Sequence, residues 1–308
     1  MSGEDRVAVV GAGGWLGLAT LELLSQTLGA GFDRRVVAFG SSQRTLQLRG
    51  GLRIAQQPLS RLIELPPAPT LVLHLAFLTK DRAESMAEDH YVAANRAISS
   101  AVREALDPIG ACAVFVPSSG AAYAAHDPEA TPAARLYGRL KLDDEASFEA
   151  WAQAADKRAV IARVFNLSGP YMNKLGSYAL STFILDVLAG RPIKIRARRE
   201  VFRSYVAIRE LMSLVFGLLV DGRDGTTRLD TAGDATLEMA DLAETVRAAL
   251  GRRDLSIDRP ALGDAPPDVY VGDGALYSDL RRRVGVAPVD FPTQVRETAD
   301  YLAAERVV

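Results

Sequence analysis

The stretch RVAVVGAGGWLG, which runs from Arg6 to Gly17, decides the fold of this chain. It opens with a short, mostly apolar run that is long enough for one buried strand. Gly11, Gly14 and Gly17 follow in GxxGxxG spacing, and residues 18–28 have the pattern of a helix. A strand, a glycine turn and a helix in this order are typical of a dinucleotide-binding site. Residues without Cβ let the backbone approach the pyrophosphate, and the helix N-terminus offers free N–H groups.

The composition is that of a globular protein with a sizeable core. The chain has 308 residues, 48% of them hydrophobic, so it can hold one large α/β domain with or without a smaller one. A net charge of -2 argues against a dedicated nucleic-acid-binding protein. Cys112 is the single cysteine, so no intrachain disulfide can form, and we expect a cytoplasmic protein. No stretch resembles a signal peptide or a membrane span.

Strands alternate with helices up to about residue 170. The expected strands are 35–39, 51–55, 71–75, 111–116 and 159–164, and the expected helices are 18–28, 81–106 and 133–155. This alternation predicts an α/β fold with a Rossmann-type, doubly wound parallel sheet that is covered by helices on both faces.

The pattern changes after Gly169-Pro170. Helices are expected at 178–188, 210–219, 237–250, 275–284 and 293–304, with strands near 193, near 205 and at 227–230, and a loop at 260–271. We therefore expect an NAD(P)-binding Rossmann domain at 1–170. A smaller C-terminal α/β substrate lobe at 171–308 is expected to be partly interleaved with the main sheet.

Tyr137 and Lys141 form a YxxxK pattern on the helix expected at 133–155. Residues four apart on a helix share one face, so the lysine ammonium favours the phenolate and makes the tyrosine a usable general acid or base. Ser118 and Ser119 end the preceding strand, where a hydroxyl can bind the same substrate oxygen. This set suits hydride transfer between a nicotinamide and a carbon whose oxygen exchanges a proton with the tyrosine.

A surface tyrosine and lysine are the usual explanation of an isolated YxxxK. Here a glycine turn, a serine pair and YxxxK come in the required order on one α/β pattern, which favours the catalytic interpretation.

Nearly the whole chain resembles an extended short-chain dehydrogenase/reductase of the NAD-dependent epimerase/dehydratase family. The resemblance is carried by VVGAGGWLG, LVLHLAF, HYVAANRA, VPSSGAAY, YGRLK, RVFNLSGP, FRSYV and LDTAGDATLEMADLAETV. In the same order, these stretches are similar to eight features of the family: the cofactor turn, the fourth strand, the helix asparagine, the serine strand end, YxxxK, RxFNxxGP, the RDYV segment and the late strand-helix unit. Members mostly act on nucleotide sugars, so the resemblance implies a nucleotide-sugar enzyme of carbohydrate biosynthesis.

The resemblance also implies roles for single residues. Ser119, Tyr137 and Lys141 would be catalytic, and Ser119, Asn166 and Arg203 would hold the substrate, with Arg203 on its diphosphate. The implied cofactor contacts are Gly11, Gly14, Trp15, Leu16, Gly17, Leu75, Ala76, Asn95, Ser118, Tyr137, Lys141 and Phe165. Arg203 fits a surface ion pair equally well. No His, Cys and carboxylate cluster has metal-ligand spacing, so no metal is expected.

The end of the second strand bears on the choice of cofactor. An NAD site usually has an acid about 20 residues past the glycine motif, which binds the ribose 2′-OH. No acid is present there, and Asp33 lies at the wrong end of the strand. Ser41, Ser42 and Arg44 suit a 2′-phosphate, so we expect NADP (NADPH), with NAD as the alternative. The same two serines can also simply turn the chain.

The residues after Ser119 narrow the reaction. Gly120 and Ala121 stand where similar dehydratases have an Asp-Glu pair, which argues against a 4,6-dehydratase. Similar 3,5-epimerases have a cysteine at this place, so Gly120 argues against that reaction as well. Hydride transfer at one carbon remains, and the favoured interpretation is NADPH-dependent reduction of a 4-keto nucleotide sugar with Tyr137 as proton donor. The alternatives are a C4 epimerase with retained NAD, a reductase of a small non-sugar carbonyl, and a non-catalytic redox sensor.

The resemblance implies a homodimer as well. Members often pair through the two helices expected here at 81–106 and 133–155, and alanine-rich stretches in both would allow close approach. Apart from a nucleotide-sugar substrate, neither nucleic acid nor membrane is expected as a partner.

Overall fold

The computed structural model describes residues 5–154, 156–221 and 225–305. The chain forms two compact units, which are described separately below. Unit 1 comprises Met1–Val164 and Ser213–Leu229, and unit 2 comprises Phe165–Met212 and Asp230–Val308. In the part of the chain that the structure describes, no helix has both the length and the apolar character needed to cross a bilayer.

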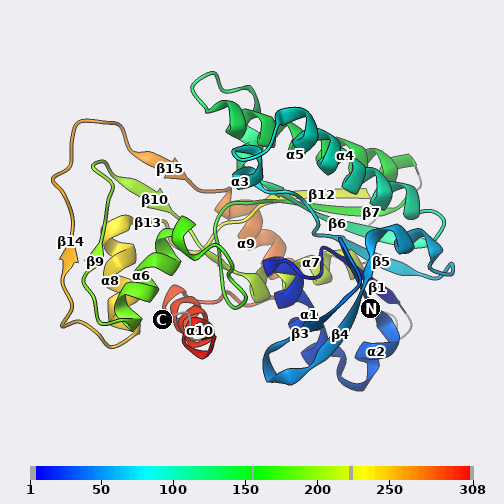
Figure 1. Ribbon diagram of the computed structural model, residues 1–308, viewed down its shortest axis with the longest axis horizontal. Coiled ribbons are helices and arrows are strands. Elements are labelled where there is room, and N and C mark those ends of the chain that lie inside the picture. The colour runs from blue at the N-terminus through cyan, green and yellow to red at the C-terminus, as the bar shows by residue number, and fades with distance from the viewer. Residues whose placement is uncertain (1–4, 155, 222–224, 306–308) are drawn as a thin grey trace. The chain divides into compact units, whose positions relative to one another are not determined.

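An eight-stranded sheet organises unit 1 (Figure 1). Its strands are β1 (Arg6–Val10), β2 (Val36–Gly40), β3 (Arg44–Gln47), β4 (Arg53–Pro58), β5 (Thr70–His74), β6 (Ala111–Ser119), β7 (Arg158–Val164) and β12 (Gly225–Asp230). Their order is β12-β7-β6-β5-β1-β2-β4-β3, and the six strands from β7 to β4 are parallel. The expected doubly wound α/β fold is confirmed, because the strand order reverses direction on either side of β1.

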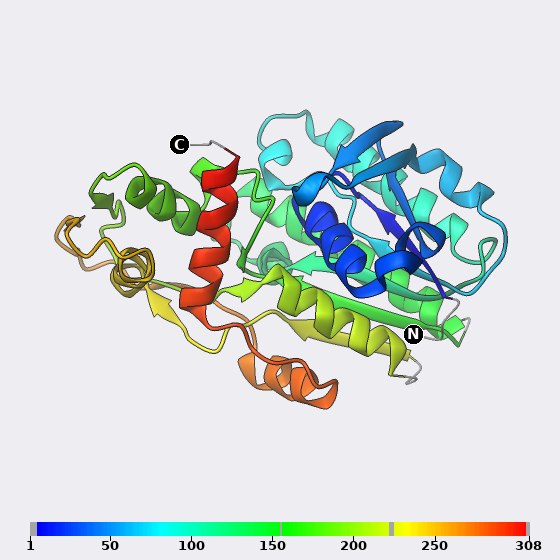
Figure 2. The same cartoon turned by 90° about the horizontal axis from the view of Figure 1, so that it is seen from below.

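Helices lie on both sides of this sheet (Figures 1 and 2). The helices of unit 1 are α1 (Trp15–Leu28), α2 (Phe32–Arg35), α3 (Lys80–Ala83), α4 (Glu88–Ala105), α5 (Pro132–Ala154) and most of α7 (Ile208–Val220). Short 3-10 turns add η1 (Gly29–Gly31), η2 (Arg49–Gly51), η3 (Leu59–Glu64) and η4 (Gly120–His126). In both views α4 and α5 run side by side on one side of the sheet, and α1 and α7 lie on the other.

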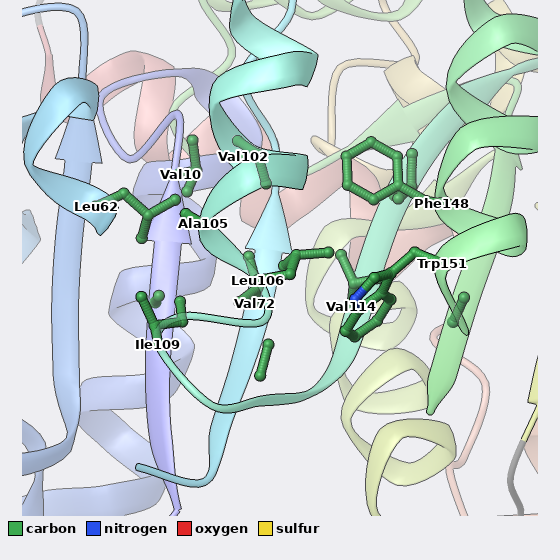
Figure 3. Packing of buried hydrophobic residues seen from close by; sticks show 14 of the residues in the cluster. Val10, Leu62, Val72, Val102, Ala105, Leu106, Ile109, Val114, Phe148 and Trp151 are labelled. Atoms are coloured by element: carbon green, nitrogen blue, oxygen red, sulfur yellow. The ribbon is translucent and has the colours of Figure 1, made fainter. Parts of the chain in front are cut away.

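The main core fills the space between the sheet and the pair α4 and α5 (Figure 3). Val102 from α4 and Phe148 and Trp151 from α5 are fully buried against strand residues such as Val72 and Val114. Central parallel strands buried on both faces read as continuous apolar runs, which is why these strands were predictable from the sequence. The same packing fixes α5 over the ends of β6 and β7.

Two expectations for unit 1 are wrong. The helix expected at 81–106 is broken into α3 and α4, with Ala87 in an extended conformation just before α4. The unpredicted strand β3 pairs antiparallel with β4, so the sheet is not wholly parallel. The expected end of the long helix at residue 155 lies outside the described residues.

The described part of unit 2 consists of helices and short strands around a core of its own. The helices are α6 (Ala179–Leu188), α8 (Met239–Ala249), α9 (Gly274–Arg283) and α10 (Phe291–Ala304), with the 3-10 turn η5 (Leu175–Ser177) before α6. The strands are β8 (Leu167–Ser168), β9 (Ile193–Lys194), β10 (Val201–Arg203), β11 (Val206–Ala207), β13 (Leu237–Glu238), β14 (Ile257–Asp258) and β15 (Asp268–Tyr270). The loop expected at 260–271 thus contains one strand, because β15 pairs with β10.

Candidate active site

The glycine turn packs tightly against the ends of two strands. The backbone N–H groups of Gly11 and Ala12 both donate to Phe39 O, at 2.9 and 3.0 Å. Gly11 has a φ of +85°, and a Cβ on it would lie 2.5 Å from Ala76 N. A Cβ on Gly17 would lie 2.3 Å from Gly11 O, so both positions require glycine. Helix α1 then starts without a side-chain cap at Gly14.

The end of β2 is polar and carries no acid. A Cβ on Gly40 would collide with the Gln56 side chain, which is buried and donates from Nε2 to Ser42 O at 2.7 Å. Gln56 Oε1 is a buried acceptor without a hydrogen-bond partner among the described residues. Sequence reasoning missed Gln56, whose role depends on the pairing of β2 with β4.

Arg44 is brought to the glycine turn by the unpredicted strand β3. The position that a Cβ would take on Gly13 lies 1.8 Å from Arg44 Nη2, so the guanidinium covers this part of the turn. Arg44 is exposed, and it forms no ion pair with any described residue. Ser41 and Ser42 are exposed beside it. Two hydroxyls and a free guanidinium therefore flank the turn where β2 ends.

The loop after β5, which contains Leu75 and Ala76, is tied to α4. Asn95 is 1% exposed, and its Oδ1 accepts a hydrogen bond from Leu78 N at 2.8 Å. The Tyr91 hydroxyl donates to Leu78 O at 2.6 Å. In this structure Asn95 therefore shapes the loop that faces Gly11.

Tyr137 and Lys141 lie one turn apart on α5, as expected, and meet Phe77 from the same loop. Lys141 Nζ donates to Pro117 O at 3.0 Å and lies 3.5 Å from the centre of the Phe77 ring. It is 5.9 Å from the centre of the Tyr137 ring, which packs edge-on against Phe77. The lysine thus lies between the tyrosine and the end of the strand that carries Ser119.

Burial sets the charge of Lys141. The side chain is 4% exposed, and burial lowers its pKa to about 8, although Asp144 and Glu145 act in the opposite direction. Burial also raises the pKa of Asp144, and its Oδ2 has no hydrogen-bond partner among the described residues. His74 is a core histidine, with its pKa lowered to about 3 by burial and by Lys141.

The two serines at the end of β6 play different parts. Ser119 Oγ accepts a hydrogen bond from Ala121 N at 3.1 Å, so its own O–H remains available to a ligand. Ser118 is buried and donates to Glu145 Oε1 on α5. Sequence reasoning missed Glu145, although it lies four residues after Lys141 on the same helix.

Three predicted residues belong to unit 2 and cluster around β10 and β15. The Phe165 ring lies 4.6 Å from the Tyr270 ring, and Asn166 Nδ2 donates to Ser204 O and Tyr270 O at 3.1 and 3.4 Å. Arg203 pairs with both carboxylate oxygens of Asp268 at 3.2 Å. The ion pair considered for Arg203 is therefore present, with a partner that the sequence did not indicate.

Unit 2 also contains a pocket of about 230 Å³ at the start of α6. Tyr178, Phe183 and Ile195 give it apolar walls, and Lys194 and Arg196 line it as well. Neither of these two cations forms an ion pair within the described ranges. The pocket therefore combines apolar walls with two positively charged side chains. No group of side chains suited to a metal ion occurs among the residues described.

Residues 7–228 match the NAD dependent epimerase/dehydratase family. The chain belongs to this family. The match spans the glycine turn, Ser119, Tyr137 and Lys141, so these stand in the sequence context of a family of enzymes.

Solved structures of similar fold include two 4-epimerases with sugar-nucleotide ligands and a 4,6-dehydratase. UDP-N-acetylglucosamine 4-epimerase from Methanobrevibacter ruminantium, in complex with UDP-N-acetylmuramic acid, is 17% identical, with 98% of this chain and 99% of that chain covered and a TM-score of 0.73. UDP-glucuronic acid 4-epimerase from Bacillus cereus, with UDP-glucuronic acid and NAD, is 17% identical, with 97% and 99% covered and a TM-score of 0.68. dTDP-glucose 4,6-dehydratase from Streptomyces venezuelae, with NAD, is 18% identical, with 98% of each chain covered and a TM-score of 0.70. Curated protein sequences give no match.

Proposed function

We propose that this family member is a nicotinamide-dependent oxidoreductase that acts on a nucleotide sugar. The observation that carries the proposal is the placement of Tyr137, Lys141 and the Ser119 strand end around Phe77 in unit 1. The chain fits a dinucleotide, because Gly11 and Gly17 let the turn pack tightly against its own backbone and against the loop after β5, and α1 begins there without a side-chain cap. The bound nicotinamide would supply the hydride acceptor or donor.

The side chains of unit 1 would exchange a proton with the substrate oxygen and stabilise the charge that results. Ser119 Oγ accepts a hydrogen bond from Ala121 N with one of its two lone pairs, and its O–H would donate to that oxygen. Tyr137 would donate a proton to the oxygen in reduction and accept one in oxidation. With a pKa of about 8, Lys141 is mostly charged at neutral pH, so it would stabilise the phenolate that donation leaves.

The substrate's nucleotide would bind in unit 2. The pocket at the start of α6 offers apolar walls to a base, and Lys194 and Arg196 offer charge to phosphates. Asn166 and Arg203 would hold the rest of the substrate, with Arg203 oriented by Asp268. The nucleotide sugars named for the solved relatives support this substrate class.

We further propose that NADPH is the cofactor and that the reaction is reduction of a 4-keto sugar. Arg44 over the glycine turn and the missing acid at the end of β2 support a 2′-phosphate. Gly120 and Ala121 supply no acid for dehydration. The second candidate is a C4 epimerase with retained NAD, which is favoured by the NAD-containing 4-epimerase of similar fold.

The identity of the bound dinucleotide tests these alternatives. Freshly purified protein is denatured, the released nucleotide is identified, and cofactor-free protein is titrated with NADPH and NADH. Weak, exchangeable binding that favours NADPH supports the reductase and leads to a screen of 4-keto nucleotide sugars by NADPH consumption. Tight NAD that co-purifies with the protein contradicts the reductase and supports the epimerase.

A further inference from the structure

A buried carboxylate joins α5 to the ends of two strands. Glu145 lies one turn after Lys141 and is 2% exposed. Its Oε1 accepts hydrogen bonds from Ser118 Oγ and from Arg163 Nε at 2.9 Å, and its Oε2 accepts one from Arg163 Nη2 at 2.8 Å. One side chain therefore connects the helix of the YxxxK pattern to β6 and to β7.

This cluster is charged, and its charges are paired. Burial opposes the Glu145 carboxylate, but the bonds from Arg163 and Ser118 outweigh it and keep the pKa of Glu145 below its ordinary value. The bonds to Glu145 also raise the pKa of Arg163. The guanidinium lies 4.6 Å from the centre of the Tyr123 ring, which covers its outer side. Bidentate, charge-assisted bonds of this kind fix geometry more strongly than neutral ones.

Glu145 holds the side chain of Ser118, which is the residue next to Ser119. Ser118 is opposite Arg163 in the β6–β7 ladder, and Ser119 is opposite Val164. Because Ser118 is held by its side chain as well as by the ladder, the backbone at Ser119 has little freedom. The bond from Ala121 N then restrains Ser119 Oγ, so the position of the hydroxyl follows from the backbone.

We propose that Glu145 is a positioning residue, which holds Ser119 in register with Tyr137 and Lys141 through its bond to Ser118. The inference rests on the proposed function, because it assigns a role within the same hydride-transfer site. Glu145 touches no reacting atom. Its effect is to set the distance between a hydroxyl on β6 and a phenol on α5, and displacements of about 1 Å can cost about a hundred-fold in rate.

Two variants and one matched control test this role. Ser118→Ala removes the link and leaves the Arg163 pair intact, and Glu145→Gln removes the carboxylate charge. Glu149→Gln is the control, because Glu149 lies one turn further along α5, pairs with Arg228 on the edge strand β12 and forms no hydrogen bond with either serine among the described residues. We expect the first two variants to lower kcat about ten- to a hundred-fold, with KM changed less than about two-fold, and Glu145→Gln to leave the cofactor Kd within the same limit. The control keeps wild-type kcat.

The double variant Ser118→Ala/Glu145→Gln should be no slower than the slower single variant, because both changes break the same link. Wild-type kcat in Ser118→Ala overturns the proposal, since that variant keeps the ion pair and differs by one oxygen. A loss in Glu145→Gln that merely follows the folded fraction, measured by thermal unfolding, also overturns it.

Amide hydrogen exchange in cofactor-free protein separates this inference from the proposed function. Faster exchange at residues 118–121 in Glu145→Gln, but not in Glu149→Gln, supports positioning even if no nucleotide sugar is turned over. Unchanged exchange in that segment contradicts positioning, whereas a wild-type protein that is inactive toward every nucleotide sugar contradicts the proposed function.

Discussion

Replacing Lys141 by methionine tests the energetic cost of the buried ammonium. Lys141 is 4% exposed, and burial lowers its pKa from 10.5 to about 8. This drop corresponds to a penalty of about 3 kcal/mol on the charged form in the folded protein. The bond to Pro117 O and the contact with the Phe77 ring offset about 2 kcal/mol of it. We expect Lys141→Met to lose turnover and yet to be about 1 kcal/mol more stable at pH 7.

The sign of the pH dependence follows from the two pKa values. Between pH 8 and pH 10.5 the unfolded chain binds more protons at Lys141 than the folded protein does, so stability rises with pH. The penalty is fully present below about pH 8 and disappears as the pH rises through the unfolded value. Between pH 7 and pH 9 the free energy of unfolding of the wild-type protein should therefore rise by about 1 kcal/mol relative to that of the variant.

Urea unfolding of the cofactor-free proteins at pH 7 and pH 9 measures this difference. Tryptophan fluorescence reports on unit 1, because Trp15 and Trp151 both belong to it. A difference between wild type and variant that does not change with pH refutes the reasoning. So does a variant that is less stable than wild type by more than about 2 kcal/mol at pH 7, because the bonds of Lys141 would then exceed its burial penalty.

Three further outcomes follow from the structure. Arg44→Ala should raise the Kd of NADPH about ten- to a hundred-fold and that of NADH less than about two-fold, measured by nucleotide fluorescence. An equal rise in both Kd values would show that Arg44 does not bind the 2′-phosphate. Gly17→Ala puts a methyl 2.3 Å from Gly11 O, so it should distort the turn, cost about 2 kcal/mol and abolish dinucleotide binding in calorimetry; wild-type affinity would contradict the role of this turn in binding. Glu238 pairs with Arg259 and has its pKa lowered to about 2, so its contribution is present above pH 4.5 and is lost as the pH falls through 2. Glu238→Gln should cost about 2 kcal/mol in thermal unfolding at pH 6 and much less near pH 2, and an equal cost at both would contradict the ion pair.

The sequence was sufficient where the structural signal is local. The apolar run of β1, the glycines after it and the buried strand β5 can be read residue by residue, and the structure has each of them. β3 was missed because only Leu46 of its four residues is buried. The break between α3 and α4 lies at residues 84–87, where Ala87 is extended, and no glycine or proline marks it in the sequence. The acidic pair that opens α4, Glu88 and Asp89, was the one available signal.

In the candidate site too, residues with a local sequence signal were found and residues that act through tertiary contacts were missed. Tyr137 and Lys141 were found because helical spacing alone puts them on one face. Phe77 and Glu145 were missed because their roles depend on contacts between segments that are far apart in the chain. The depth at which Lys141 is buried, and hence its lowered pKa, likewise depends on the packing of α5 against the strands and could not be derived from the pattern.

The most direct test of the central claim is the turnover of Tyr137→Phe. The wild-type protein and the variant are assayed with a panel of 4-keto nucleotide sugars, by NADPH consumption, and with the matching sugar alcohols and NAD. We predict a loss of about a hundred- to ten-thousand-fold in kcat, with the cofactor Kd unchanged, because only the proton donor is removed. Turnover at the wild-type rate in the variant would contradict the claim that this phenol exchanges the proton with the substrate oxygen.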